Sequence, residues 1–498
     1  MRPHRSWSRY RTRHVPTARV LVATGSGLAP LHDGRLRLAV TVVTLLALAL
    51  LTLATPTRGE SLPVDPATVG DGRIEIETYF LEIANPDPEI SNRAFDAIEA
   101  LWHPGFVVMA VEVLRFIPQD RRQRLLRIVR ARSGKDFGMD FDQWYDWIWS
   151  QEPNDPPRYA EFKALLYGLI DRKFVGYFSS ERASTIRLDE VRWGGVVQDG
   201  IPPLRGPEMI TAAQARYLQD DNVVFGLEIE GDARAYPKRI LAWHEMFVDT
   251  VGGVPVAGVY CTLCGSMILY ETRHDGVDHA LGTSGFLYRS NKLMFDQATQ
   301  SLWNTLWGRP VIGPLVGQDI ELEVRSVVTT TWGEWRRRHP DTTVLSLNTG
   351  HDRDYGEGVA YQDYFSTDEV MFTVPELDRR LKNKAEVLIV EPRAAGDEPL
   401  ALASKFLRKN KLHHDRQGEL EFVVLTDGSG AHRAYATDGL SFKRWDGSAV
   451  ATDSEGGRWT LSEQALSHED GRTLRRLSAH RAFWFGWYAA NPNTRLVK

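Results

Sequence analysis

Residues 253–272 read GVPVAGVYCTLCGSMILYET, and this stretch indicates the type of fold. β-Branched and aromatic residues stand on both sides of Cys261-Thr-Leu-Cys264, and Gly265 suits a left-handed turn position. We therefore expect a strand, a tight turn and a second strand here. Similar short runs, separated by Gly, Pro and Asp, continue from about residue 190 to the C-terminus, which predicts a β-rich region.

The β-rich region contains an internal repeat. Residues 253–272 align without gaps on residues 418–437, which read GELEFVVLTDGSGAHRAYAT. Residues 331–345 likewise resemble residues 483–497, in the same order along the chain. Matches that recur in one order are hard to ascribe to chance, so we expect two related halves that pack together.

The second copy of the repeat lacks both cysteines. Thr426 and Ser429 stand opposite Cys261 and Cys264, although the glycine of the turn and a following tyrosine are kept. The fold of the repeat therefore does not require the thiols. This comparison favours a functional role for the cysteine pair.

The part of the chain that precedes the β-rich region has the spacing of helices. Apolar residues recur at helical intervals from about residue 71 to residue 151, which predicts a small antiparallel helical array. We expect Ser91 to cap one of its helices. The expected helices cover residues 74–83, 90–102, 105–116 and 119–129, and a short one follows near 159–169.

The N-terminus has the pattern of an export signal or membrane anchor. Residues 1–37 carry eight arginines and one acidic residue, and the uncharged run Leu38–Ala54 follows them. This order keeps the basic end in the cytoplasm and predicts a single-pass membrane protein with its body outside the cytoplasm. The body would be secreted if the apolar segment were cleaved.

The predicted fold class is α+β, with the chain divided into seven parts. These are a basic cytoplasmic segment (1–37), a transmembrane or signal segment (38–54), a linker (55–70), a helical domain (71–155), a connecting segment (156–189) and two β-rich repeats (190–350 and 351–498). The body is acidic once the basic N-terminus is set aside, which argues against nucleic acid as a partner. The helical domain is a candidate for contact with a protein partner.

The cysteine pair is the main candidate for chemistry. Two thiolates two residues apart, followed by glycine, are typical of a metal knuckle, and Cys261 and Cys264 would be ligands of a copper or zinc ion. The further candidate ligands are His244, His279 and Met294, with His244 the strongest. A thiol oxidoreductase, inert buried thiols, and a non-catalytic binding module with a structural disulfide remain open alternatives.

An ordered set of motifs resembles a known family. The motifs are residues 233–245 (ARAYPKRILAWHE), 252–256 (GGVPV), 260–266 (YCTLCGS), 301–303 (SLW) and 480–487 (HRAFWFGW). Together they resemble the exported bacterial and archaeal family called domain of unknown function 3179, over about residues 185–498. The chain departs from the family pattern at Thr262 and Ser266, where the family usually has Pro and Thr. The resemblance implies no established activity.

Overall fold

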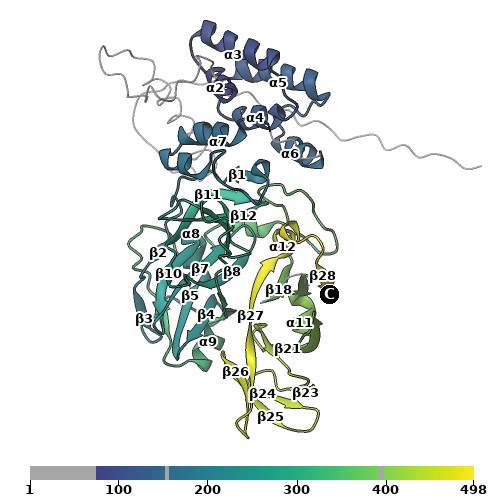
Figure 1. Cartoon of the computed structure of the whole chain (residues 1–498). Coiled ribbons are helices and arrows are strands. Elements are labelled where there is room, and N and C mark those ends of the chain that lie inside the picture. The colour runs from purple at the N-terminus through teal and green to yellow at the C-terminus, as the bar shows by residue number, and fades with distance from the viewer. Residues whose placement is uncertain (1–74, 152–155, 392–397) are drawn as a thin grey trace, which may run out of the picture. The chain divides into compact units, whose positions relative to one another are not determined.

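The structure is a computed structural model that describes residues 75–151, 156–391 and 398–498 (Figure 1). All of these residues belong to one compact unit, Gly59–Lys498. The predicted basic segment, the apolar run Leu38–Ala54 and the linker lie outside the described residues. Among the helices of the described part, none has the length and apolar character needed to cross a membrane.

The helical array predicted from periodicity is present. Its helices are α2 (Ile76–Glu82), α3 (Pro88–Ala100), α4 (Phe106–Val113), α5 (Gln119–Ser133), α6 (Phe141–Ser150) and α7 (Tyr159–Gly168), followed by the 3₁₀ helices η2 (Arg172–Tyr177) and η3 (Leu188–Glu190). The prediction that Ser91 is an N-cap is wrong. Asp87 caps α3 by accepting from Glu89 N, and the hydroxyl of Ser91 is buried and donates to Ile83 O.

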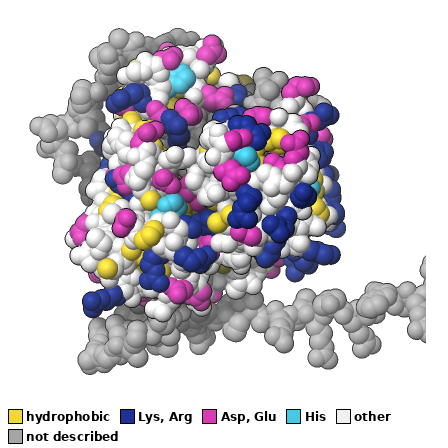
Figure 2. All heavy atoms as spheres, turned by 90° about the horizontal axis from the view of Figure 1, so that it is seen from below, with side chains coloured by type: hydrophobic (Ala, Val, Ile, Leu, Met, Phe, Trp, Pro, Cys, Tyr) yellow, Lys and Arg dark blue, Asp and Glu magenta, His cyan; other side chains and the backbone are white. Residues whose placement is uncertain are grey.

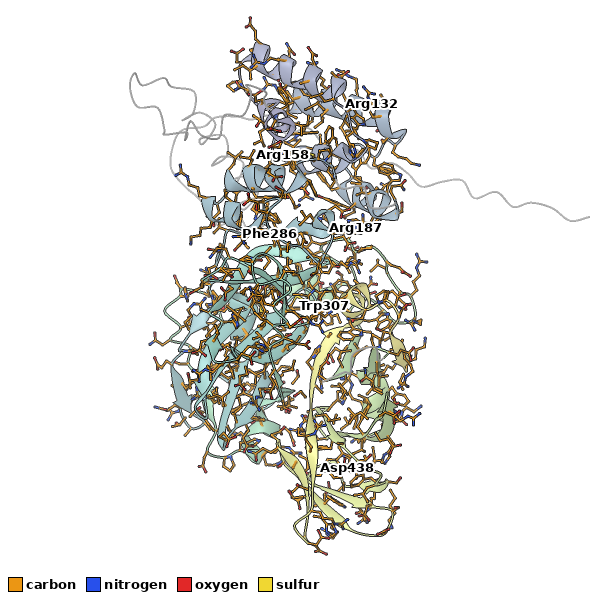
Figure 3. The ribbon with its side chains drawn as sticks, in the orientation of Figure 1. Arg132, Arg158, Arg187, Phe286, Trp307 and Asp438 are labelled. Carbon is orange, nitrogen blue, oxygen red and sulfur yellow. A yellow bond between two sulfur atoms is a disulfide. The ribbon has the colours of Figure 1, made fainter. Side chains whose placement is uncertain are left out.

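One apolar core joins the helices to the first sheet. Every residue of α4 is buried, so α4 is the central helix of the array. The same core cluster includes Phe286 and Phe295 of the β-rich region. Phe286 lies where the helices meet that region (Figure 3), and its ring contacts the rings of Tyr167 and Phe174 edge-on at 5.1 and 4.9 Å.

The first half of the β-rich region forms three sheets of five strands. Their strand orders are β1-β11-β12-β13-β14, β15-β8-β7-β6-β2 and β16-β4-β5-β17-β3, and β9 pairs with β10. The bounds are β1 (Val191–Trp193), β2 (Leu204–Arg205), β3 (Met209–Thr211), β4 (Val223–Ile229), β5 (Asp232–Pro237), α8 (Lys238–His244), β6 (Met246–Val251), β7 (Val254–Cys261), β8 (Ser266–Glu271), β9 (Arg273–His274), β10 (Val277–Asp278), β11 (Leu281–Tyr288), β12 (Asn291–Asp296), β13 (Leu302–Asn304), β14 (Arg309–Ile312), β15 (Val324–Arg325), β16 (Val328–Thr331), α9 (Trp332–Arg338) and β17 (Thr343–Leu345).

The second half forms one large sheet, in which β27 pairs with both β18 and β22. The bounds are α10 (Gln362–Ser366), β18 (Glu386–Glu391), β19 (Leu400–Ala403), α11 (Ser404–Lys409), β20 (Leu412–Gln417), β21 (Leu420–Thr426), β22 (His432–Ala436), β23 (Phe442–Trp445), β24 (Val450–Asp453), β25 (Arg458–Leu461), β26 (Ala465–His468), β27 (Thr473–Phe483), α12 (Trp484–Ala490) and β28 (Arg495–Val497). Figure 2 shows one face of the molecule, on which basic and acidic side chains are interspersed.

The two halves share an order of elements and a pattern of pairing. The order β4-β5-α8-β6-β7-β8 matches β18-β19-α11-β20-β21-β22, and β16-α9-β17 matches β27-α12-β28. In the first half β16 pairs with β4 antiparallel, and β17 pairs with β5 parallel. In the second half β27 pairs with β18 antiparallel, and β28 pairs with β19 parallel.

A long connection joins the halves. Residues 347–385, called the covering segment below, contain only the short helix α10. The covering segment packs on the cysteine turn, because Tyr364 belongs to the same apolar cluster as Cys261 and Cys264. The cysteine turn is therefore an internal feature of the fold.

Candidate functional site

The two cysteines form a disulfide at the tip of the β7–β8 hairpin. Cys261 ends β7 and pairs with Ser266, the first residue of β8, so the strand, turn and strand predicted from the sequence are present. Gly265 completes the turn with a φ of +60°, a conformation that side chains with a Cβ rarely adopt. Within the described part of the chain there is no free cysteine.

The disulfide is buried, with Cys261 1% and Cys264 0% exposed. Aromatic side chains surround it, because the covering segment and the start of α12 pack against the turn. The backbone of α12 approaches closely, since a Cβ at Gly486 would lie 2.7 Å from the Cβ of Cys264. Phe483 N also donates to Cys264 O at 2.7 Å. Access to the sulfurs therefore requires one of these elements to move.

Polar groups of the turn are placed next to the sulfur atoms. Cys264 N donates to Cys261 Sγ at 3.4 Å, and Ser266 Oγ lies 3.6 Å from Cys264 Sγ. The hydroxyl of Tyr364 donates to Leu263 O at 2.6 Å and so fastens the covering segment to the turn. A backbone N–H aimed at Cys261 Sγ would stabilise a thiolate there after reduction.

A buried ion pair lies beside the disulfide. Glu245 follows α8 with a φ of +57°, and its Oε1 accepts from Thr262 Oγ1 at 2.5 Å and from the Tyr361 hydroxyl at 3.1 Å. Lys292 Nζ, from β12, lies 3.5 Å from Glu245 Oε2 and donates to Glu245 O at 2.7 Å. Both charged residues are 5% exposed. Thr262 lies between the two cysteines in the sequence, so its hydrogen bond to Glu245 joins the ion pair directly to the cysteine turn.

Burial controls the electrostatics of this cluster. It lowers the pKa of Lys292, and the negative charge of Glu245 opposes that shift. Burial also raises the pKa of Tyr361, which keeps that phenol neutral and able to donate to Glu245. The cluster is thus a carboxylate and an ammonium held in a water-poor environment next to a disulfide.

His244, the strongest of the predicted additional ligands, has both ring nitrogens engaged elsewhere. Nδ1 lies 2.9 Å from Pro202 O, and Nε2 lies 2.6 Å from the Tyr355 hydroxyl. Because a carbonyl only accepts, Nδ1 carries the proton and Nε2 accepts from the phenol. Burial lowers the pKa of His244 to about 4, so the ring is neutral near pH 7.

His279 and Met294 lie in a different part of the core. His279 Nδ1 is 3.3 Å from Asp296 Oδ2, and the ring packs against Trp303. Met294 pairs with Trp303 across β12 and β13 and belongs to the same cluster as that tryptophan, whereas the cysteines belong to another. The structure thus bonds Cys261 to Cys264 and places His279 and Met294 beside Trp303.

Among the residues that the structure describes, no group of three or more His, Cys, Asp or Glu side chains is arranged to hold a metal ion. The two sulfurs are bonded to each other, so they would have to be reduced before either could act as a thiolate ligand. Copper or zinc binding stays a prediction.

Glu245 and Lys292 contact the site although the sequence pattern did not single them out for it. Lys292 stands in the strand NKLMFD, which is otherwise rich in apolar residues, and a lysine in such a strand is a signal of a buried, paired charge. Glu245 directly follows His244, and the residue chosen as a ligand was one position away from the residue that meets the turn.

The comparisons with known proteins identify a family and no function. No curated protein and no solved structure matches the chain significantly. A family described as "protein of unknown function (DUF3179)" matches residues 198–494, which include both halves and the cysteine turn. This match covers more than half of the chain, and the chain therefore belongs to the DUF3179 family.

Proposed function

We propose that this chain is a thiol–disulfide redox protein whose centre is the Cys261–Cys264 pair. The observation that carries the proposal is the junction of the disulfide with the buried Glu245–Lys292 pair through Thr262. Buried charges are costly and are retained in proteins chiefly where they are paired or where function needs them.

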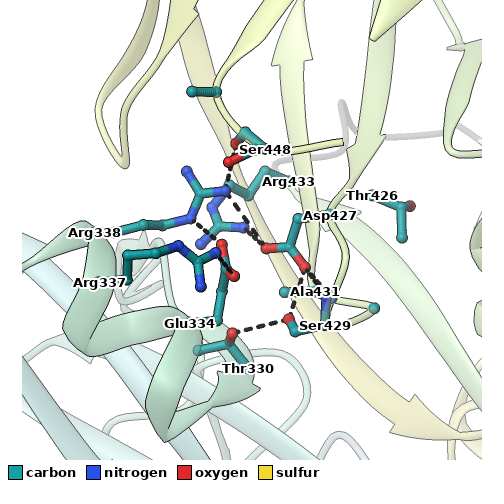
Figure 4. Close-up of polar contacts among 12 residues, drawn as sticks. Thr330, Glu334, Arg337, Arg338, Thr426, Asp427, Ser429, Ala431, Arg433 and Ser448 are labelled. Carbon is teal, nitrogen blue, oxygen red and sulfur yellow. Dashed lines mark hydrogen bonds and ion pairs between the residues drawn. The ribbon is translucent and has the colours of Figure 1, made fainter. Parts of the chain in front are cut away.

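The second half of the chain supports the proposal as an internal comparison. We infer that the halves descend from a duplicated unit, because their order of elements and strand pairing agree. In the turn of the second half, Asp427 accepts from Ser429 and Ala431 and pairs with the buried Arg433 (Figure 4). One half thus closes its turn by hydrogen bonds and an ion pair alone, so closure of such a turn does not require a disulfide.

The proposed reaction is exchange with a dithiol of a partner protein. A thiolate of the partner forms a bond to one cysteine sulfur, the Cys261–Cys264 bond breaks, and its electron pair leaves on the other sulfur. The second thiol of the partner then resolves the mixed disulfide. Two electrons and two protons pass to the pair, which becomes two thiols, and the partner becomes a disulfide. The Cys264 N–H would stabilise the Cys261 thiolate.

We propose that the body of the chain works outside the cytoplasm. The eight arginines of residues 1–37 and the apolar run Leu38–Ala54 support this placement, with the membrane as a partner of the N-terminal segment. A C-terminal fusion to alkaline phosphatase, which is active only after export, should be active in a bacterial host. An inactive phosphatase fusion, beside an active cytoplasmic reporter at the same position, would contradict the placement.

Alkylation of the full chain tests the redox function. The folded protein is incubated with a small dithiol, and the reaction is quenched with an alkylating reagent. Mass spectrometry then gives the mass of the intact chain. We expect reversible addition of two alkyl groups while the protein keeps its native circular dichroism. In Cys264→Ser, the Cys261 thiolate should attack an added small disulfide, release one of its two thiols and remain trapped as a mixed disulfide. A disulfide that reacts only after the protein unfolds would end the proposal.

A second candidate is a binding module in which the disulfide is structural. Burial of both sulfurs favours it, since a sealed disulfide exchanges slowly. In that case the helical array would carry the surface for a protein partner. The same experiment separates the two, because a structural disulfide stays closed in the folded chain. Metal analysis of the anaerobically reduced protein, beside Cys261→Ser and Cys264→Ser, tests copper or zinc binding.

A further inference from the structure

The charges next to the disulfide have a consequence for its redox equilibrium. We propose that the Glu245–Lys292 pair tunes the Cys261–Cys264 couple, with Lys292 favouring the reduced, thiolate form and Glu245 opposing it. This inference rests on the proposed function and assigns two positioning residues to it. Neither residue takes part in the exchange of bonds.

The inference rests on the hydrogen bonds that join Glu245 to the chain on both sides of Cys261. Glu245 Oε1 holds Thr262, the residue that follows Cys261, and the backbone O of Glu245 accepts from Tyr260 N, before Cys261. Lys292 is held by two contacts to Glu245. Its neighbour Asn291 donates through Nδ2 to Gly486 O, and Gly486 is the residue packed on Cys264.

Reduction and ionisation of one cysteine place a new negative charge on the turn to which Glu245 is hydrogen-bonded through Thr262. A thiolate is stabilised by a nearby ammonium and destabilised by a nearby carboxylate, and the effect is large where water is excluded. In the native protein the two charges are paired, and their effects on a thiolate oppose each other. Removal of one of them leaves the other uncompensated, so the two single variants should shift the couple in opposite directions.

Other titratable groups also lie around the site. Asp199 and Glu245 are the acidic residues whose charges act on Lys292. Tyr260, Tyr361 and Tyr364 face the turn or Glu245, and burial raises the pKa of each, so they remain neutral near pH 7. Lys238 of α8 lies over the Phe365 ring on the covering segment, and burial lowers its pKa.

The test uses the full chain and measures two quantities in each variant. They are the midpoint potential of the disulfide and the thiol pKa, the latter from the ultraviolet absorbance of the thiolate as a function of pH. Lys292→Met should lower the potential and raise the thiol pKa by about one unit. Glu245→Gln should raise the potential and lower the thiol pKa. A tenfold change in the exchange equilibrium corresponds to about 30 mV.

A second buried pair in the chain provides the matched control. Lys163 Nζ lies 2.7 Å from Glu112 Oε1 in the helical array, and both residues are buried as deeply as Lys292 and Glu245. Lys163→Met should destabilise the fold but leave the potential and the thiol pKa unchanged. Glu245→Gln preserves the shape of the side chain, so the sign of its shift is decisive even if Lys292→Met does not fold.

Shifts of the same sign in Lys292→Met and Glu245→Gln, or no shift in either, would overturn the inference. An equal shift in Lys163→Met would do so as well. These outcomes leave the proposed function intact, provided that the native disulfide is reducible in the folded chain. A disulfide that resists reduction in the folded native protein would instead refute both.

Discussion

At the scale of single residues, the cysteine turn depends on a close approach that only glycine allows. Gly265 has a φ of +60°, and a Cβ there would lie 2.8 Å from the ring of Phe483. Gly430, its counterpart in the second half, also has a positive φ, but its nearest neighbour is the flexible side chain of Arg408 at 3.2 Å. Substitution of both glycines therefore distinguishes the cost of backbone strain, which the two positions share, from the cost of a clash with Phe483, which only Gly265 has.

Gly265→Ala should cost about 3 kcal/mol of unfolding free energy, because strain at positive φ adds to overpacking against Phe483. Gly430→Ala should cost only about 1 kcal/mol, from the backbone strain alone. Chemical denaturation of the oxidised proteins measures both values. Equal costs for the two variants would show that Phe483 does not press on the cysteine turn.

His244 should make the stability of the fold depend on pH. Its pKa is about 4 in the folded chain and about 6.5 in an unfolded one. Between these values the unfolded state binds the extra proton, so stability is full above about pH 6.5 and is lost as the pH falls towards 4. The loss should approach about 3 kcal/mol, and His244→Gln should lack it.

Denaturation midpoints of wild type and His244→Gln at several pH values check this expectation. The difference in unfolding free energy between the two proteins should shrink as the pH falls. A difference that stays constant between about pH 7 and pH 4 would mean that the ring is protonated in the fold, or that it titrates normally.

At the scale of elements, the covering segment packs against the disulfide and its turn. It has one short helix, and the Tyr364 hydroxyl fastens it to Leu263 O in the turn. Its other anchors include Tyr361 on Glu245 and Tyr355 on His244. Hydrogen bonds of this kind contribute about 1 kcal/mol each, so the segment can open locally without global unfolding.

Tyr364→Phe should speed reduction of the disulfide by a small dithiol about fivefold, since loss of the bond to Leu263 O makes opening of the segment easier. Tyr435→Phe is the matched control, because its hydroxyl also donates to a backbone carbonyl at 2.6 Å, that of Ser462 in the second half. Samples quenched by alkylation at successive times give the rate of disulfide reduction in both variants. Unchanged kinetics in Tyr364→Phe would place the route to the sulfurs elsewhere.

Much at this scale could be predicted from local pattern. The β-branched and aromatic residues within 253–272 predicted the β7–β8 hairpin, and apolar periodicity predicted the helices, because both signals depend on short-range geometry. The N-cap at Ser91 failed because Asp87, followed by Pro88, begins the helix earlier. The contact of Glu245 with Thr262 was not predicted, because it depends on the left-handed conformation in which the chain leaves α8 at Glu245.

At the scale of the whole molecule, the turn of each half meets the strand–helix junction of the other half. Cys264 O accepts from Phe483 N, where β27 passes into α12, and Ser429 lies 3.2 Å from Thr330, near the end of β16 (Figure 4). The sequence repeat predicted two related halves. It could not predict this reciprocal packing or the path of the covering segment, since both depend on contacts between residues far apart in the chain.

The redox role of the cysteine pair is tested most directly by the midpoint potential of the full chain, equilibrated in dithiol buffers of graded potential and read by alkylation. We predict a reversible two-electron transition in the folded protein, with a midpoint potential above about −300 mV. Structural disulfides typically have potentials below about −300 mV. A pair that stays oxidised until the protein unfolds, or that titrates below about −300 mV, would contradict the account.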